Sequence, residues 1–96
     1  MDQLGRFDIA EHGGLLMVVI ESELLPPDPA VVVVPLIKGY PAIQYLNPEI
    51  AVNGGSFICA TRLIASVRRA SLKRIGTAED QSDEIIRAID ILLSGV

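Results

Sequence analysis

The sequence lacks the features that usually cross-link a small protein. It contains one cysteine, Cys59, and one histidine, His12, in 96 residues. A single cysteine excludes an internal disulfide, and one cysteine with one histidine are too few for a structural zinc site. A chain of this size buries only about two-thirds of its unfolded surface. The length predicts one domain, residues 1–96, and half of its residues are hydrophobic. Because neither a disulfide nor a metal can stabilise it, we predict that the chain gains stability as a homodimer.

The sequence also has no basic excess, no signal-like start and no long apolar run. Its formal charge is -4, which argues against a protein that coats nucleic acid. The N-terminus is acidic and lacks the basic and apolar start of a signal peptide. The longest apolar runs, 15–20 and 30–37, are far shorter than the roughly 20 residues that cross a bilayer. We therefore expect a cytoplasmic protein that makes no membrane contact.

What the sequence does contain is a series of short β-type segments with turn residues between them. Strands are predicted at residues 6–10, 15–21, 31–37, 49–52 and 56–60. The Gly13-Gly14 and Asn53-Gly54 turns predict two hairpins. Pro35 cannot donate to a sheet ladder, so we expect it at a sheet edge or bulge. Five short strands with tight turns favour a small, mainly β barrel.

The last third of the chain predicts one amphipathic helix. Thr77 or Ser82 can cap it, and acidic residues follow in its first turn. Its apolar stripe contains Ile85, Ile86, Ile89, Leu92, Leu93 and Val96. The opposite face holds Asp83, Glu84, Arg87, Ile91 and Ser94. Ile91 is unexpected on a solvated face and is a candidate for a docking surface. Residues 62–74, before the helix, predict a strand end followed by a turn or short helix.

Eight short motifs resemble the CcdB family of gyrase-poisoning toxins in the same order and at nearly the same spacing. In the first half they are Arg6-Phe7-Asp8, residues 21–25, residues 33–36 and Leu46-Asn47-Pro48. In the second half they are residues 65–67, 83–85, 88–90 and 93–96. None of these motifs is specific alone, but together they extend over essentially the whole chain.

The resemblance implies a mainly β, SH3-like barrel with one C-terminal helix, acting as a homodimer. Family members bind the A subunit of DNA gyrase and trap the enzyme on cleaved DNA. Their contact is made by the last residues of the helix, which correspond here to Ser94, Gly95 and Val96. Ser22, Leu24, Leu25 and Arg87 match positions that support the same surface. The resemblance further implies a type II toxin–antitoxin module that maintains a plasmid or other genetic element, with a CcdA-like antitoxin that folds onto the toxin.

Ser94 departs from the family pattern, which has an aromatic residue there in many members. An aromatic side chain can supply a few kcal/mol at an interface, and a serine cannot replace it. Arg87 and Ile91 lie on the same predicted helix face and are the natural substitutes. The chain therefore poisons gyrase through different contacts, binds it weakly, or has another target.

Two other function classes stay open. A MazF-like toxin endoribonuclease would need an acid–base pair beside a phosphate-binding arginine. Arg62 and Arg68 could supply the cation, but no carboxylate or histidine lies near them in sequence. The second class is a non-toxic dimer or adaptor that binds only its antitoxin.

Five basic residues in the stretch 62–74 form a solvated or antitoxin-binding surface, or contact phosphate. They are Arg62, Arg68, Arg69, Lys73 and Arg74. Neither a recognition helix nor stacking aromatics accompany them, so direct sequence-specific DNA binding is not expected. Cys59 is predicted to fill the core and His12 to lie in an exposed turn. We expect no catalysis, no metal and no cofactor.

Overall fold

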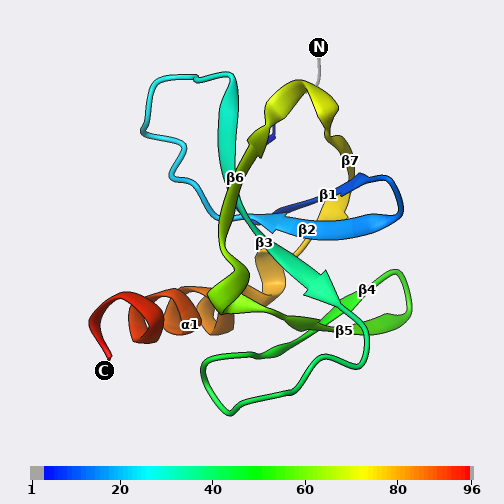
Figure 1. Ribbon diagram of the computed structural model, residues 1–96, viewed down its shortest axis with the longest axis vertical. Helices are drawn as coiled ribbons and strands as arrows, with labels where there is room; N and C mark the ends of the chain where they lie inside the picture. Colours follow the sequence, from blue (N-terminus) through cyan, green and yellow to red (C-terminus); the bar gives the residue numbers. More distant parts are fainter. Residues whose placement is uncertain (1–3, 96) are drawn as a thin grey trace.

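The computed structural model describes residues 4–95 (Figure 1). Seven strands come first: β1 Asp8–His12, β2 Leu15–Val19, β3 Ala30–Ile37, β4 Glu49–Val52, β5 Gly55–Cys59, β6 Ala65–Arg68 and β7 Lys73–Thr77. Three short 3-10 turns are interspersed: η1 Thr61–Leu63, η2 Arg69–Ser71 and η3 Glu79–Gln81. One α-helix, α1 Ser82–Ser94, follows them.

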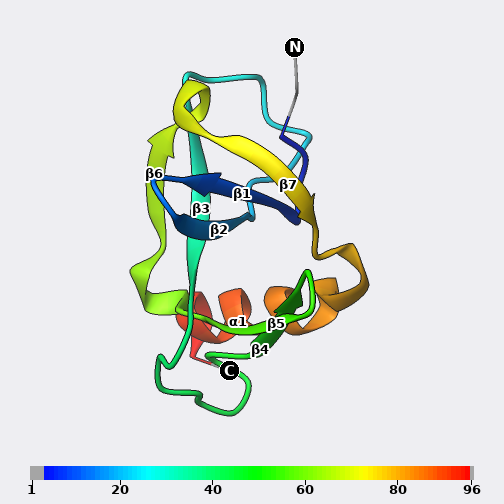
Figure 2. The ribbon, with the colours of Figure 1, turned by 90° about the vertical axis from the view of Figure 1, so that its right-hand side faces the viewer.

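All strand pairs are antiparallel, and the sheet curls because β3 changes partner along its length. The main order is β4-β5-β3-β2-β1-β7. The first half of β3 pairs with β6 and its last two residues pair with β5, while β2 lies along its other edge. Figures 1 and 2 show the two ends of β3 in different parts of the curled sheet. The predicted mainly β barrel with one C-terminal helix is confirmed.

The prediction that Pro35 lies at a sheet edge or bulge is wrong. Pro35 sits in the central strand, opposite Met17 of β2. On the other side of β3, Pro35 falls between the segment that pairs with β6 and the segment that pairs with β5. Its carbonyl still accepts a hydrogen bond from the Ala60 N–H at 2.9 Å. A residue without a donor is tolerated at this junction because the ladder is interrupted there.

The sheet buries apolar side chains on both faces, as the alternation along its strands requires. One core contains Ile9, Val18, Val34 and Ile50, and α1 covers it with Ile85. A second core consists of Ala10, Met17, Val19, Val31 and Val33, with Leu4, Val67 and Leu72 packed against it. The first core fixes α1 on the barrel and therefore sets which helix face points outward.

The helix forms where it was predicted, but neither predicted residue caps it. Gln81 occupies the N-cap position, and no side chain bonds the free N–H groups there. The Gln81 amide instead accepts from the Ala51 N–H at 3.0 Å and donates to the Ala51 carbonyl at 3.3 Å. Ser82 is already helical, and the Thr77 hydroxyl accepts from the Glu79 N–H. The helix start is thus fastened to β4, which sequence alone does not reveal.

The C-terminal turn of α1 differs from the predicted amphipathic pattern. Leu93, assigned to the buried stripe, is 75% exposed. Ile91, assigned to the solvated face, is partly buried. The cause is that the last turn extends beyond the strands, so helical periodicity no longer decides burial there (Figure 1). Gly95 then ends the helix in the left-handed conformation that glycine favours.

The stretch 62–74 contains more strand than predicted. β6 followed by the η2 turn agrees with the predicted strand end and turn, but β7 was missed. β7 pairs with β1, and Arg74 of β7 forms an ion pair with Asp8 at 3.1 Å. A strand this rich in cations lacks the apolar alternation by which strands are found in a sequence.

Candidate partner-binding surface

The outward face of α1 carries three of the predicted contact residues. Arg87, Ile91 and Ser94 are spaced four and three residues apart, which places them on one helix face. Arg87 and Ser94 are exposed. The Ser94 hydroxyl, however, donates to the Asp90 carbonyl of its own helix at 2.8 Å. Ser94 therefore offers a partner neither apolar area nor a free hydroxyl proton.

Arg87 stacks on an aromatic ring from a loop that is distant from the helix in the sequence. Its guanidinium carbon lies 5.0 Å from the centre of the Tyr45 ring, a cation–π arrangement. Tyr45 is 50% exposed. Among residues 4–95, Arg87 makes no ion pair within 4 Å. The face thus presents a ring and a cation together.

The 41–47 loop, which carries Tyr45, is held by several hydrogen bonds. The Asn47 amide donates to the Pro41 carbonyl at 3.1 Å, and the Asn47 N–H donates to the Ile43 carbonyl at 2.8 Å. The buried Thr61 hydroxyl donates to the Leu46 carbonyl at 2.5 Å. These bonds leave the loop few alternative conformations.

The 20–29 loop carries the other predicted contact residues, Ser22, Leu24 and Leu25. The Ser22 hydroxyl accepts from the Leu24 N–H at 3.1 Å and shapes the turn. Leu24 is 94% exposed and Leu25 56%. Arg69 anchors the two ends of the loop, since it pairs with Glu21 at 3.5 Å and donates to the Asp28 carbonyl at 3.0 Å.

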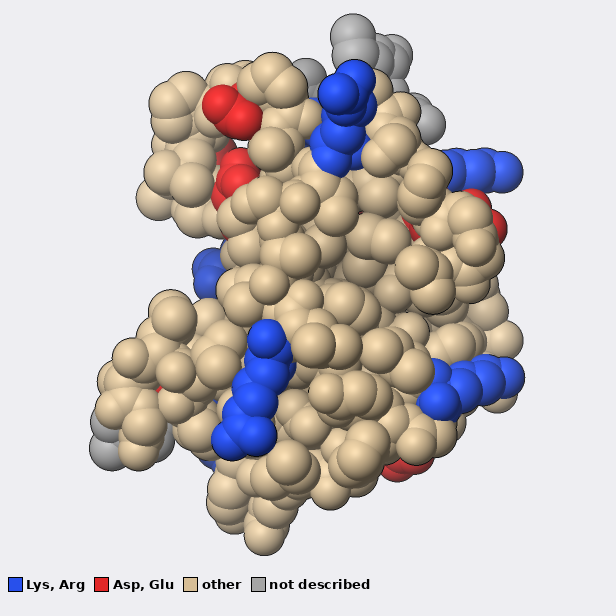
Figure 3. All heavy atoms as spheres, in the orientation of Figure 1, with Lys and Arg blue, Asp and Glu red and all other residues tan. Residues whose placement is uncertain are grey.

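Within one chain the structure does not bring these two groups into a single patch. The 20–29 loop and the end of α1 lie on the same side of the molecule, at different heights (Figure 1). Figure 3 shows a notch between these two parts of the surface. Gly95 follows directly after α1, whereas Val96 lies outside the described residues.

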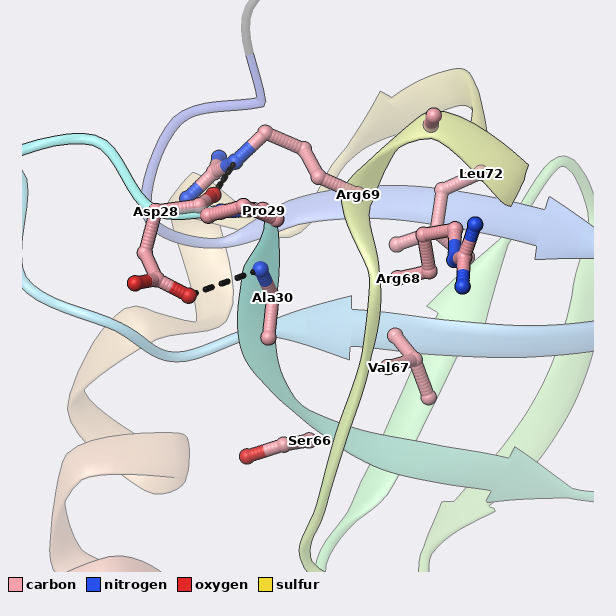
Figure 4. A pocket seen from close by; sticks show the side chains of 9 residues that line it. Asp28, Pro29, Ala30, Ser66, Val67, Arg68, Arg69 and Leu72 are labelled. Atoms are coloured by element: carbon pink, nitrogen blue, oxygen red, sulfur yellow. Dashed lines mark hydrogen bonds between the residues drawn. The ribbon is translucent and has the colours of Figure 1, made fainter.

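A shallow groove of about 990 Å³ lies beside β6. Its walls are Asp28, Pro29 and Ala30 on one side and residues of β6 and η2 on the other (Figure 4). Within residues 4–95, β6 pairs with β3 alone, so its second edge has no strand beside it. Main-chain groups along such an edge can pair with another strand.

The five basic residues of the stretch 62–74 do not act as one cationic surface. Arg69 pairs with Glu21 and Arg74 with Asp8, so two of the five charges are matched internally. Figure 3 shows the lysine and arginine side chains of this face well separated from one another. In the described part of the chain, no carboxylate lies within 4 Å of a nitrogen of Arg62 or Arg68.

The other reactive side chains are used structurally. The Cys59 thiol is fully buried, and this burial raises its pKa, with a smaller opposing effect of the hydrogen bond with Thr61. Cys59 is therefore the core residue that its strand pattern predicted. His12 is exposed as expected, and its Nδ1 lies 2.9 Å from the Ser71 carbonyl, which links the β1–β2 turn to η2. No set of three potential metal ligands occurs among residues 4–95.

These features define a small, curled antiparallel barrel with one covering helix and exposed apolar side chains on its loops and helix end. A family model described as CcdB protein matches residues 8–95. The chain therefore belongs to the CcdB family, as its motifs had suggested. A comparison with curated proteins finds no match. No helix in the described part of the chain is long and apolar enough to cross a membrane.

Three exposed side chains on this surface were missed from the sequence. Leu93 was assigned to the buried stripe of the helix, whereas Tyr45 and Leu63 were not assigned to any surface. Leu63 is 45% exposed in η1, which packs against α1. Leu93 is exposed because the end of α1 extends beyond the strands, and Tyr45 because it lies in the loop before β4; neither position has a periodic signal in the sequence.

Proposed function

We propose that this protein is the toxin of a type II toxin–antitoxin module and that it binds the A subunit of DNA gyrase. In this proposal residues 1–96 form one toxin domain that acts in the cytoplasm of a bacterium. It inhibits the topoisomerase by trapping it on cleaved DNA, without catalysing a reaction, and thereby helps to maintain a plasmid or other genetic element. The CcdB family match over residues 8–95 is the observation that carries the proposal.

The proposed gyrase contact consists of the α1 end and the 20–29 loop. On the helix it contains Arg87, Ile91 and Ser94, which Gly95 and Val96 follow in the sequence, and on the loop it contains Ser22, Leu24 and Leu25. The exposure of Leu24, Leu25 and Arg87 supports this set. The neighbouring Leu93, at 75% exposure, extends the apolar area that a partner would cover.

We further propose that the working unit is a homodimer. Leu63 exposes apolar area in the η1 turn directly before β6, and within residues 4–95 the second edge of β6 has no strand beside it. A second copy would cover both Leu63 and this edge and would leave Leu24 and Leu25 open to the gyrase subunit. It would also add the buried area that a short chain without cross-links needs.

The antitoxin in this proposal is a CcdA-like chain with an unfolded segment that becomes ordered on the toxin. The cations Arg62, Arg68 and Lys73 are exposed and suit an acidic partner.

A cleavage-complex assay tests the proposal. The purified protein is incubated with the gyrase of its host, ATP and supercoiled plasmid, and linear DNA is measured after detergent treatment. We expect linear DNA with the full chain and little with a chain that lacks Gly95 and Val96. If saturating full-length protein yields no linear DNA, gyrase poisoning is excluded.

A second candidate function is a non-toxic dimer that binds only its antitoxin. The Ser94 hydroxyl, which is turned back to the Asp90 carbonyl, favours it because the family's aromatic contact is missing. Induced expression separates the two functions, since an adaptor leaves growth unchanged and a toxin stops it.

A further inference from the structure

We propose that Tyr45, stacked on Arg87, is the aromatic anchor with which this protein holds the gyrase A subunit. The inference rests on the proposed function and names the residue that takes the place of the aromatic lacking at position 94. The ring comes from the 41–47 loop, far from the helix end in sequence, and meets α1 through the Arg87 guanidinium.

The first observation is backbone strain at Tyr45. Its φ is 70°, in the left-handed region that bulky side chains rarely adopt. Glycine or asparagine would occupy this position at lower cost. The Tyr45 ring is 50% exposed and does not belong to either apolar core. A strained residue whose side chain does little for the core is typical of a functional site.

The second observation is that the loop is prepared before any partner arrives. Thr61, Asn47 and the Ile43 carbonyl fix its backbone from three directions. A ring held this way loses little conformational entropy on binding, which is what makes rigid aromatic residues effective interface anchors.

The third observation is that the Arg87 guanidinium, stacked on the Tyr45 ring, is available to a partner. Arg87 has no carboxylate within 4 Å in the described part of the chain, although Asp83, Glu84 and Asp90 lie on the same helix. Its guanidinium can therefore stack on the ring and keep N–H donors for a carboxylate of the partner. The chemistry that fits is an acidic side chain beside an apolar patch on the gyrase A subunit.

The Tyr45–Arg87 pair also compensates for the weak contacts that the rest of this helix face offers a partner. Ser94 bonds its own helix, and Ile91 is partly buried. Arg87 lies on the same face as both residues, so a partner seated over the end of α1 reaches the Tyr45 ring as well. The aromatic contact is thus moved from the helix end to the adjoining loop.

The test is the dissociation constant for the purified gyrase A subunit, measured by calorimetry on folded variants. Tyr45→Phe keeps the ring and is expected to bind within about threefold of the unaltered protein. Tyr45→Asn removes the ring and is expected to bind at least about tenfold more weakly, as loss of an interface hot spot implies. Because asparagine tolerates a positive φ, this variant is also expected to unfold at the same temperature or higher. Tyr40→Ala is the matched control and should bind normally, because Tyr40 lies in the same β3–β4 connection but has no cation over its ring among residues 4–95.

Each outcome separates the inference from the function on which it rests. Weaker binding by Tyr45→Asn with unchanged thermal stability supports the anchor. Equal binding by the unaltered protein and Tyr45→Asn overturns the anchor and leaves gyrase binding intact. No binding by the unaltered protein removes both, and the cleavage-complex assay then identifies the proposed function as the part that failed.

Discussion

The buried hydroxyl of Thr61 should matter more for stability than its small size suggests. It is fully buried and donates to the Leu46 carbonyl at 2.5 Å, in the loop that carries Tyr45. Thr61→Val keeps the shape of the side chain but leaves that carbonyl, on a residue only 8% exposed, without its hydroxyl donor. Loss of one partner of a buried hydrogen bond costs about 2 kcal/mol. For a domain of this size, that lowers the unfolding temperature by about 8–16 °C.

The matched control is Thr61→Ser, which keeps the hydroxyl and removes only a methyl group. The unfolding temperatures of the three proteins should be compared by calorimetry at one protomer concentration, because dimerisation makes them concentration-dependent. Thr61→Ser should lose about 1 kcal/mol or less, the value of one buried methyl group. If Thr61→Val is as stable as the unaltered protein, or more stable than Thr61→Ser, the hydroxyl does not hold the loop as described.

Two further predictions concern association and pH. Leu63→Glu should convert the proposed dimer into monomers in sedimentation experiments, because it places a charge in a covered apolar surface. Leu15→Glu, at a hairpin position that is more exposed (65% against 45% for Leu63), should leave the dimer intact. A dimer that survives Leu63→Glu would place the interface elsewhere. Burial raises the pKa of Cys59 above its ordinary value of 9.0, so between pH 9 and the higher pKa of the folded chain the thiol ionises in the unfolded chain alone. The contribution of the neutral buried thiol to stability is therefore fully present below pH 9 and is lost by about 1.4 kcal/mol per pH unit within that interval. Stability should thus fall more steeply with pH for the unaltered protein than for Cys59→Ala, and equal declines would contradict the assignment.

The parts of the fold that depend on local pattern could be predicted from the sequence. The two hairpins, the loop at 26–29 and the terminal helix each have their own turn residues or periodicity, and all appear in the structure. β7 was missed because its residues are mostly charged or small. Pro35 was placed at an edge because a sequence does not show that β3 changes partner at that residue.

The candidate surface was less predictable for a related reason. Helical spacing correctly placed Arg87 and Ser94 on the outward face. It could not show that the end of α1 extends beyond the sheet, which leaves Leu93 exposed. The pairing of Tyr45 with Arg87 joins residues 42 positions apart, and it depends on a loop whose shape is set by Thr61 and Asn47. Long-range contacts of this kind leave no periodic signal in one sequence.

The most direct test of gyrase as the target is the mass of the complex that this protein forms with the gyrase A subunit. Both purified proteins, mixed at tens of micromolar, would be separated by size exclusion and weighed by light scattering. We expect one peak that contains both chains and has the mass of a toxin dimer bound to the A subunit. Two separate peaks with the masses of the free proteins would contradict gyrase as the target.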